Sequence, residues 1–316
     1  MTAGEIVVVG GINSDYLVRG ARLPAPGETV QGEVFREGAG GKGANQAVGI
    51  ARLGVRVALI GRVGADARGE ALCGALRAEG LDQSLVTRDP AEPTGAALIA
   101  VDRDGEKQIM TAPGANRALG EADIEKAQAR IALAEVMLVG LEVPLAAVTA
   151  ALRLGKAAGV KTLLDPAPAA PLSEELLRLV DVISPNESEA EVLTNVKVSD
   201  VRSAAQCARV LLARGASAAV VRGGGEGTLV ATSTEQHVIP RHSVAHVDAT
   251  GAGDAFMAAL AVALAEGRSL VDAAVFANAA AAFSTTRVGA QAGLPRRAEL
   301  APLLSEHRVL VSRRTP

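Results

Sequence analysis

Residues 248–256 read Asp-Ala-Thr-Gly-Ala-Gly-Asp-Ala-Phe, and their last three residues open the apolar run DAFMAALAVALA at 254–265. The run predicts a buried helix that begins directly after a glycine-containing turn. The first N–H groups of a helix have no partner within the helix and attract anions. Asp254 could therefore accept a proton from a hydroxyl while the backbone of residues 251–253 stabilises a transferring phosphoryl group. A simple helix cap after a tight turn explains this stretch equally well.

Around this stretch, short β-branched runs alternate with longer Ala/Leu-rich runs. This alternation indicates right-handed βαβ crossovers. We therefore predict an α/β fold, a doubly wound and mostly parallel sheet flanked by helices. The predicted strands are residues 6–9, 57–60, 136–139, 162–164, 182–183 and 218–221. The predicted helices are residues 44–53, 67–79, 145–158, 174–179, 199–214 and 254–265.

Two segments break the alternation. Residues 17–36 are extended and rich in turn formers, and residues 95–111 have the pattern of a hairpin that turns at Asp104-Gly105. We expect two segments, about 14–37 and 95–111, to pair as a small sheet inserted within one domain of residues 1–316. Such a sheet would form a lid over the strand ends where doubly wound folds bind ligands. A β-excursion that contacts no ligand is the alternative.

The composition favours work on small molecules. Lys plus Arg total 32 against 35 Asp plus Glu, so the net charge of −3 creates no basic field for nucleic acid or an anionic membrane. The N-terminal MTAGEIVVVG lacks the features of a signal peptide, and no apolar run is long enough to span a bilayer. We expect a cytoplasmic protein. Cys73 and Cys207 stand alone among four histidines, so neither a disulfide framework nor a zinc site is indicated.

Residues 38–43, Gly-Ala-Gly-Gly-Lys-Gly, match the dinucleotide-binding pattern G-x-G-x-x-G. That fold requires an acidic residue at the end of the next strand, but residues 57–60 are followed by Gly-Arg. The Walker pattern also fails, because neither Ser nor Thr follows the Gly-Lys pair. What remains is a glycine hinge with Lys42 and Asn45 as donors for a hydroxylated ligand.

Polar residues follow several predicted strands. Asn13 and Asp15 follow residues 6–9, and Glu142 follows residues 136–139, so all three could hold sugar hydroxyls. An Asx turn and a helix cap are the local alternatives. Asn186 and Glu189 follow residues 182–183 and could orient the water shell of Mg²⁺, or simply cap the next helix. The glycine-rich loop at 222–227 could approach phosphates or form a flexible hairpin.

Taken together, the motifs resemble the ribokinase-like family of carbohydrate kinases, from residue 7 to about residue 295. GGKGANQA at 40–47 and DATGAGDAF at 248–256 correspond to the two signature regions of that family. Four further segments resemble its ribose-phosphorylating members in particular: residues 11–15, 24–30, 165–168 and 184–187. The resemblance implies ATP-dependent phosphorylation of D-ribose at its 5-hydroxyl, which yields D-ribose 5-phosphate and ADP.

The resemblance also assigns roles to individual residues. The catalytic residues would be Asp254 as general base and Gly251, Ala252 and Gly253 as anion hole. The sugar would be held by Asn13, Asp15, Gly41, Lys42, Asn45, Glu142 and Asp254. ATP would contact Asn186, Arg222, Gly223, Gly225, Gly227, Gly253 and Asn278. Activating K⁺ would lie among Asp248, Thr250, Ser284, Arg287, Gly289 and Gly293. Glu189 would bind Mg²⁺ through water, and the lid would form a homodimer interface.

This chain departs from the family pattern at three positions. Arg222 stands where Thr is common, Asn278 where His is common, and Gly293 where Ser is often found. We therefore expect its nucleotide contacts and ion dependence to differ in detail. Other hypotheses are a kinase of 2-deoxyribose, fructose or another sugar, and a catalytically silent sugar-binding sensor. The 2% aromatic content argues against a nucleoside kinase, and the missing acidic residue argues against an NAD-dependent oxidoreductase.

Overall fold

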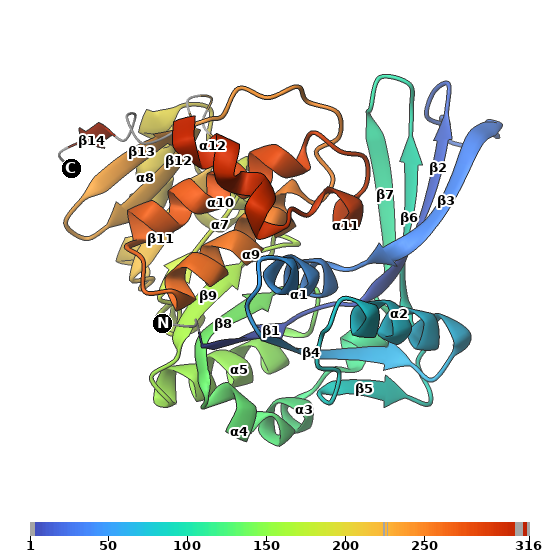
Figure 1. Cartoon of the computed structure of the whole chain (residues 1–316), viewed down its shortest axis with the longest axis horizontal. Helices are drawn as coiled ribbons and strands as arrows, with labels where there is room; N and C mark the ends of the chain where they lie inside the picture. Colours follow the sequence, from blue (N-terminus) through green and yellow to red (C-terminus); the bar gives the residue numbers. More distant parts are fainter. Residues whose placement is uncertain (1–3, 224, 226, 307–311, 315–316) are drawn as a thin grey trace.

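The structure is a computed structural model that describes residues 4–223, 225, 227–306 and 312–314. Within these residues, ten strands form the main sheet in the order β14-β13-β12-β11-β10-β9-β8-β1-β4-β5 (Figure 1). The seven strands from β11 to β5 in this order are parallel, and the others are antiparallel. The parallel strands are β1 (Glu5–Val9), β4 (Val57–Gly64), β5 (Val86–Asp89), β8 (Ala134–Gly140), β9 (Lys161–Asp165), β10 (Val182–Ile183) and β11 (Ala218–Arg222). The antiparallel strands are β12 (Gly227–Thr232), β13 (Gln236–Pro240) and β14 (Ser312–Arg314).

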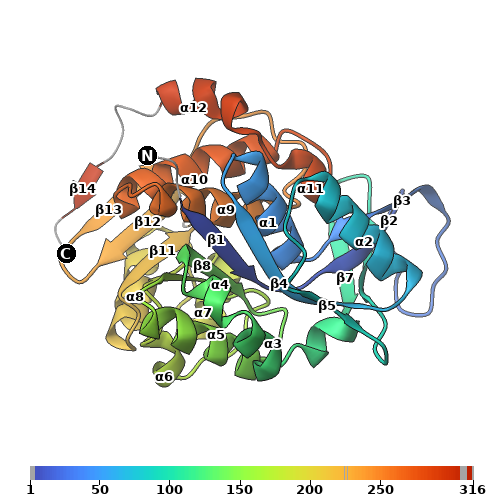
Figure 2. The same ribbon diagram turned by 60° about the horizontal axis from the view of Figure 1, so that its bottom comes forward.

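Helices cover both faces of this sheet (Figure 2). Alternate strand residues point to opposite faces, so Ile6 and Val8 belong to one buried cluster and Val7 and Val9 to the other. The first cluster lies under α1 (Lys42–Arg52), α2 (Ala67–Ala78), α9 (Ala252–Ala265) and α10 (Leu270–Ser284). The second lies under α3 (Glu121–Lys126), α4 (Gln128–Ile131), α5 (Leu145–Ala157), α6 (Glu174–Leu177), α7 (Glu187–Thr194) and α8 (Val201–Ala213). The predicted doubly wound architecture is confirmed.

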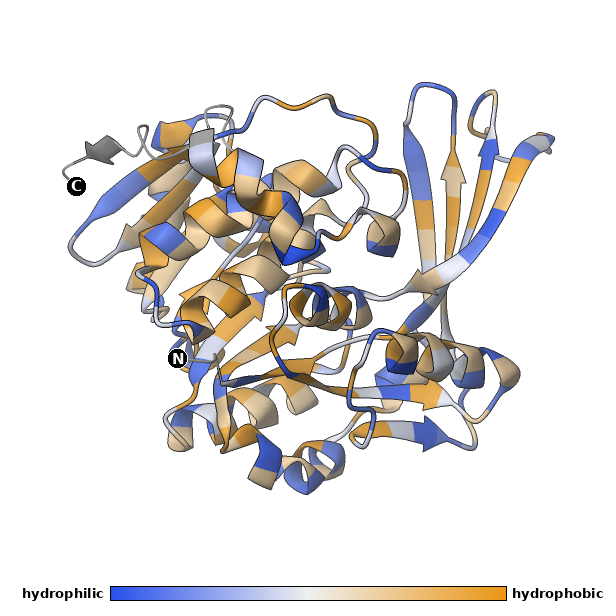
Figure 3. Ribbon diagram, in the orientation of Figure 1, coloured by the Kyte–Doolittle hydropathy of each residue, from blue (hydrophilic) through white to orange (hydrophobic). Residues whose placement is uncertain are grey.

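Apolar residues dominate the central strands and α9 (Figure 3). From Asp254 to Leu264 every residue of α9 is buried, because the helix packs against both α1 and α10 as well as the sheet. Short elements complete the C-terminal part: α11 (Ala290–Gly293), the 3₁₀ helix η2 (Arg297–Leu300) and α12 (Ala301–Glu306). Within the described residues, no helix is both long and apolar enough to cross a membrane.

The two segments that break the alternation form a separate four-stranded sheet in the order β3-β2-β6-β7. It stands at one side of the main sheet, close to the start of α1 (Figure 1). Its strands are β2 (Asn13–Gly20), β3 (Gly32–Gly40), β6 (Gly95–Val101) and β7 (Lys107–Ala112). The predicted hairpin turns at Asp104-Gly105, where Gly105 has a φ of 86°. Asn13 and Asp15 lie within β2 rather than in an Asx turn.

The antiparallel edge is the main departure from the predicted pattern. The hairpin interpretation of the 222–227 loop implied a strand after it, without bounds, and the structure shows two: β12 and β13 continue the sheet beyond β11. These strands are short apolar runs that lie next to glycines and turn formers. No helix separates them from β11, so the βαβ alternation used to place the other strands does not reveal them. The helix predicted at 174–179 is shorter in the structure, where α6 ends at Leu177.

Candidate active site

Asp254 lies at the centre of the site, in the first turn of α9. Its carboxylate is buried and accepts a hydrogen bond from Asn45 Nδ2 at 2.9 Å and one from Gln46 Nε2 at 3.3 Å. Lys42 Nζ lies 3.8 Å from Oδ1. Burial raises the pKa of Asp254, while the charge of Lys42 and the hydrogen bond from Asn45 oppose that rise. The first turns of α1 and α9 therefore meet at one carboxylate.

Asp165, at the end of β9, is a site residue to which the sequence analysis assigned no role. Its carboxylate is fully buried, accepts a hydrogen bond from Gln46 Nε2 at 2.8 Å and lies 3.6 Å from Lys42 Nζ. Burial lowers the pKa of Lys42, but the charges of Asp165 and Asp254 outweigh this effect and raise it overall. Asp165 has the same strand-end placement as Asn13 and Glu142, and this signal could have identified it.

Two further predicted sugar ligands, Glu142 and Asp15, are influenced by the charge of Asp254. Glu142 follows β8, and its Oε2 accepts a hydrogen bond from the backbone N–H of Lys42 at 2.6 Å. Burial, together with the charge of Asp254, raises the pKa of Glu142 to about 7. The same two causes raise the pKa of Asp15 to about 6. The carboxylates of Asp165 and Asp254 thus lie 3.6 and 3.8 Å from the Lys42 ammonium group, and Glu142 binds the backbone of the same residue, an arrangement that can bind several hydroxyls at once.

Asn13 depends on a residue that the sequence analysis missed. Asn116 is buried in the 3₁₀ helix η1 (Gly114–Ala118), and its Nδ2 donates to Asn13 Oδ1 at 2.8 Å. Asn116 Oδ1 in turn accepts from the backbone N–H of Ile12 at 2.9 Å. Nothing local in the sequence marks Asn116 for this role. At Gly41, which has a φ of 86°, a Cβ would lie 2.6 Å from Gly11 O, so only glycine lets α1 start this close to β1.

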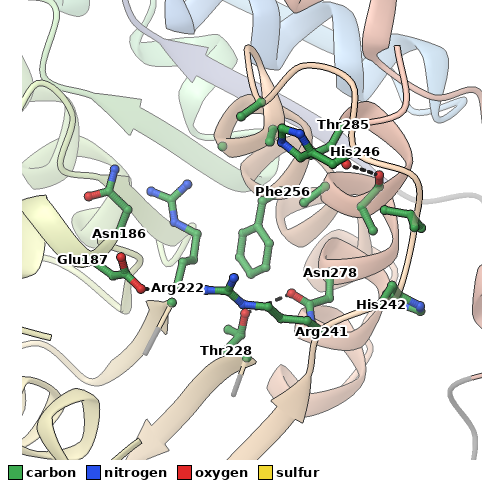
Figure 4. A pocket seen from close by; sticks show the side chains of 18 of the residues that line it. Asn186, Glu187, Arg222, Thr228, Arg241, His242, His246, Phe256, Asn278 and Thr285 are labelled. Atoms are coloured by element: carbon green, nitrogen blue, oxygen red, sulfur yellow. Dashed lines mark hydrogen bonds and ion pairs between the residues drawn. The ribbon is translucent and has the colours of Figure 1, made fainter. Parts of the chain in front are cut away.

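A cavity of about 650 Å³ reaches the start of α9, where Ala252 and Gly253, the two residues before Asp254, line it. Figure 4 shows Asn186, Glu187 and Arg222 on one side of it and Asn278, His246 and Thr285 on the other. Six predicted ATP ligands line it: Asn186, Arg222, Gly223, Gly227, Gly253 and Asn278. Among the described residues of the glycine-rich loop, Gly225 does not line it. Gly224 and Glu226 lie outside the described residues.

Asn186 and Glu189 form a capping box at the start of α7, as their capping interpretation predicted. Glu189 Oε2 accepts from the N–H of Asn186 at 2.8 Å and from Arg222 Nη2 at 3.1 Å, and Oε1 accepts from Asn186 Nδ2 at 2.7 Å. Burial raises the pKa of Glu189 despite the nearby charge of Arg222. Asn278 ties α10 to the sheet edge, because it bonds Thr228 Oγ1 and Pro240 O, each at 2.9 Å.

The residues predicted for K⁺ meet around one loop. Asp248 Oδ1 accepts from the N–H and Oγ1 of Thr250 at 2.9 and 2.6 Å, and Oδ2 accepts from the N–H of Gly289 at 2.9 Å. Burial opposes ionisation of Asp248, but these hydrogen bonds lower its pKa overall. A Cβ on Gly293 would lie 2.9 Å from Ser284 O, so Gly293 packs directly on that carbonyl.

Arg287 contributes only its backbone to this loop. Its N–H donates to Ser284 O at 3.3 Å, while its guanidinium bonds Glu299 at 2.8 Å and stacks 4.5 Å from the Phe283 ring. Within the described residues, no cluster of three or more His, Cys, Asp or Glu side chains could hold a metal ion. A cation at this loop would therefore be coordinated largely by carbonyl and hydroxyl oxygens, which suits a hard ion.

The match to known proteins covers nearly the whole chain. Residues 3–297 match the pfkB family carbohydrate kinases. The chain belongs to this family. It is 40% identical to the ribokinase of Haemophilus influenzae over 302 residues, which cover 96% of this chain and 98% of that protein. It is also 40% identical to the ribokinase of Mus musculus over 306 residues, 94% of each chain. The structure of Arabidopsis thaliana ribokinase complexed with ribose and ATP superposes with a TM-score of 0.87 at 33% identity, covering 96% of this chain and 99% of that one.

Proposed function

We propose that this protein phosphorylates D-ribose at the 5-hydroxyl with ATP, which yields D-ribose 5-phosphate and ADP. The observation that carries this proposal is the position of Asp254. Its carboxylate contacts Lys42 and Asn45, which are predicted sugar ligands, and the residue directly before it, Gly253, lines the cavity. An acceptor hydroxyl on one side and a terminal phosphate on the other would meet at this carboxylate.

In this reaction Asp254 removes the proton from the acceptor hydroxyl as the new P–O bond forms. Asn45 and Gln46 hold the carboxylate in place through their hydrogen bonds. The N-terminus of α9 supplies the anion hole from residues 251–253, because its first N–H groups point out of the helix. The N–H of Ala252 donates to Ala249 O at 3.2 Å, and this bond must yield for Ala252 to contribute.

ATP would occupy this cavity, whose volume of about 650 Å³ lies within the usual range of small-molecule and cofactor pockets. Glu189 is suited to a water-mediated contact with Mg²⁺. A carboxylate offers about four lone-pair positions, and the hydrogen bonds described above use three of those on Glu189. When bound, Mg²⁺ neutralises phosphate charge, and Asn186 and Glu189 would orient its water shell.

We also propose a K⁺ site at the loop formed by Asp248, Thr250, Ser284, Arg287, Gly289 and Gly293. The lowered pKa keeps Asp248 ionised, and the loop directly precedes the start of α9. Bound K⁺ supplies positive charge there. Asp248 would fix the loop conformation through its bonds to Thr250 and Gly289 rather than act on the substrate. Gly293 offers no side-chain oxygen, so carbonyl groups would dominate this site.

The small sheet acts in this proposal as a lid and as the interface of a homodimer. Its outer face carries exposed apolar side chains that are cross-strand neighbours: Val18 pairs with Phe35, and Leu98 with Met110. Phe35 is 63% exposed and Met110 is 72% exposed. Contiguous apolar surface of this kind is typical of protein interfaces.

We also place the protein in the cytoplasm. Cys73 and Cys207 are both free and buried, which fits a reducing compartment.

The function is tested by measuring ADP release with a panel of sugars in the presence of Mg²⁺, with and without K⁺. We expect the highest kcat/KM for D-ribose, with 2-deoxyribose and fructose as competitors in the panel. A preference for one of those sugars would move the assignment to another kinase of the same family. ADP release that no sugar stimulates would contradict kinase activity and favour a sugar-binding sensor.

A further inference from the structure

Arg222, at the end of β11, is bound to the protein mainly through one of its three guanidinium nitrogens. Nη2 donates to Asp165 Oδ1 at 3.1 Å, to Ser184 O at 2.9 Å and to Glu189 Oε2 at 3.1 Å. The side chain is only 12% exposed. These acceptors hold the guanidinium at the deep end of the cavity described above, where Arg222 is one of the lining residues.

The other two nitrogens of Arg222 are differently placed. Nε is buried and has no hydrogen-bond partner. Nη1 faces the first turn of α9, since a Cβ built on Gly253 would lie only 2.8 Å from it. The guanidinium carbon lies 5.7 Å from the centre of the Phe256 ring, one turn further along the same helix. A glycine at 253 therefore lets the cation approach the anion hole closely.

Asp165 connects this arginine to the acceptor side of the site. One of its oxygens bonds Arg222, and the other bonds Gln46 and lies near Lys42. A fully buried carboxylate between two cations is well neutralised, and it restricts where each cation can lie. Arg222 and Lys42 thus lie at the two different oxygens of the Asp165 carboxylate, close to Asp254.

We propose that Arg222 binds the transferring phosphoryl group beside the N-terminus of α9, and that Asp165 is the positioning residue that holds its guanidinium there. This inference rests on the proposed kinase function. During transfer, the bond from the γ-phosphorus to the ADP oxygen breaks and the bond to the sugar oxygen forms. The hydroxyl proton passes to Asp254, and the negative charge of the phosphoryl oxygens is stabilised by Arg222.

The first test replaces Arg222. Arg222→Gln should lower kcat by about 100-fold or more, because one preorganised donor at such a site is worth that much. The KM for the sugar should change little. Arg222→Lys should retain an intermediate kcat, since it keeps the charge but loses the planar fork. Low-millimolar guanidinium chloride should restore part of the activity of Arg222→Ala, and a purely structural arginine would give no such rescue.

A matched control separates catalysis from folding. Arg214 is also a partly buried arginine, and it bonds the backbone carbonyls of Leu193 and Leu172 away from the cavity. Arg214→Gln should lower the Tm but leave kcat unchanged. If Arg222→Gln behaves in the same way, with a lower Tm and a normal kcat, the proposed role of Arg222 is wrong.

The second test asks whether Asp165 acts through Arg222. Asp165→Asn should lower kcat in the wild-type background. In the Arg222→Gln background the further loss of kcat should be clearly smaller, because the guanidinium that Asp165 positions is then absent. Equal losses in both backgrounds would overturn the positioning role. If instead the wild-type protein shows no sugar-dependent ADP release, the proposed function fails. An active wild type with a normal Arg222→Gln variant refutes this inference alone.

Discussion

The side-chain amide of Asn45 donates a hydrogen bond of 2.9 Å to Oδ2 of Asp254, although the two residues are 209 positions apart in the chain. Each lies in the first turn of its helix, Asn45 in α1 and Asp254 in α9. Because both helices cover the same face of the sheet, their N-termini converge at the same place. The bond orients the carboxylate that we propose as general base.

Asp254→Asn should lower kcat by about 10²- to 10⁴-fold, the usual contribution of general base catalysis. Sugar affinity should remain, because the amide has the shape of the carboxylate and the other sugar ligands stay in place. Turnover measurements together with calorimetric sugar titrations check this. Asp123→Asn, a buried aspartate in α3, serves as the control and should retain normal kcat. Near-normal turnover of Asp254→Asn would rule out its role as base.

Asn13→Ala and Asp15→Ala should raise the KM for the sugar far more than the KM for ATP, because both side chains lie on the acceptor side of Asp254. Asn116→Ala should act in the same direction but more weakly, since Asn116 supports Asn13 through a single hydrogen bond. Steady-state kinetics with each substrate varied in turn distinguish the two KM values. Unchanged sugar kinetics in the first two variants would place the sugar elsewhere.

Glu142→Gln should stabilise the protein increasingly as pH rises. The pKa of Glu142 is about 7 in the folded state and 4.5 as the ordinary value, so the native state binds more protons between these values. Stability therefore falls as pH rises through this window. The glutamine variant removes this loss and can still accept the hydrogen bond from Lys42. Its Tm advantage over wild type should grow by a few degrees between about pH 5 and about pH 8. A Tm difference between variant and wild type that stays constant with pH would contradict the raised pKa of Glu142.

Asp248→Asn should weaken activation by K⁺, because the ionised carboxylate fixes the loop that we propose for the cation. The measurement is activity against KCl at constant ionic strength, and the variant should need a higher K⁺ concentration for half-maximal activity. Asp272→Asn, which alters a surface cap at the start of α10, should respond to K⁺ as the wild type does. Identical K⁺ curves for Asp248→Asn and wild type would exclude the proposed site.

Phe35→Asp should dissociate the homodimer, since a charge in an apolar interface remains unpaired. Sedimentation velocity checks this, with the wild type expected at twice the mass of one chain. Leu133→Asp changes a side chain that is 76% exposed but lies outside the small sheet, and it should leave the dimer intact. A monomeric wild type would refute the interface.

The sequence predicted much of the site because its motifs are local. Lys42 and Asn45 lie within one helical turn, and Asp254 follows its glycine turn directly, so spacing alone placed each group at a helix start. The strand-end position of Asp165 is visible in the sequence, but its contacts, like those of Asn116, are with distant residues. Gln46 lies 119 positions from Asp165, and Ile12 lies 104 positions from Asn116. No local pattern records such pairings.

The sequence by itself determined the βαβ alternation, the separate hairpin and the two glycine-containing helix starts, because these depend on periodicity and turn chemistry over a few residues. Only the tertiary structure decided that β9, β10 and β11 end side by side, so that Asp165 and Ser184 both contact Arg222. Strand order brings these groups together, and burial then compels the charges to pair. The cationic side of the proposed phosphoryl site is thus a product of topology rather than of any motif.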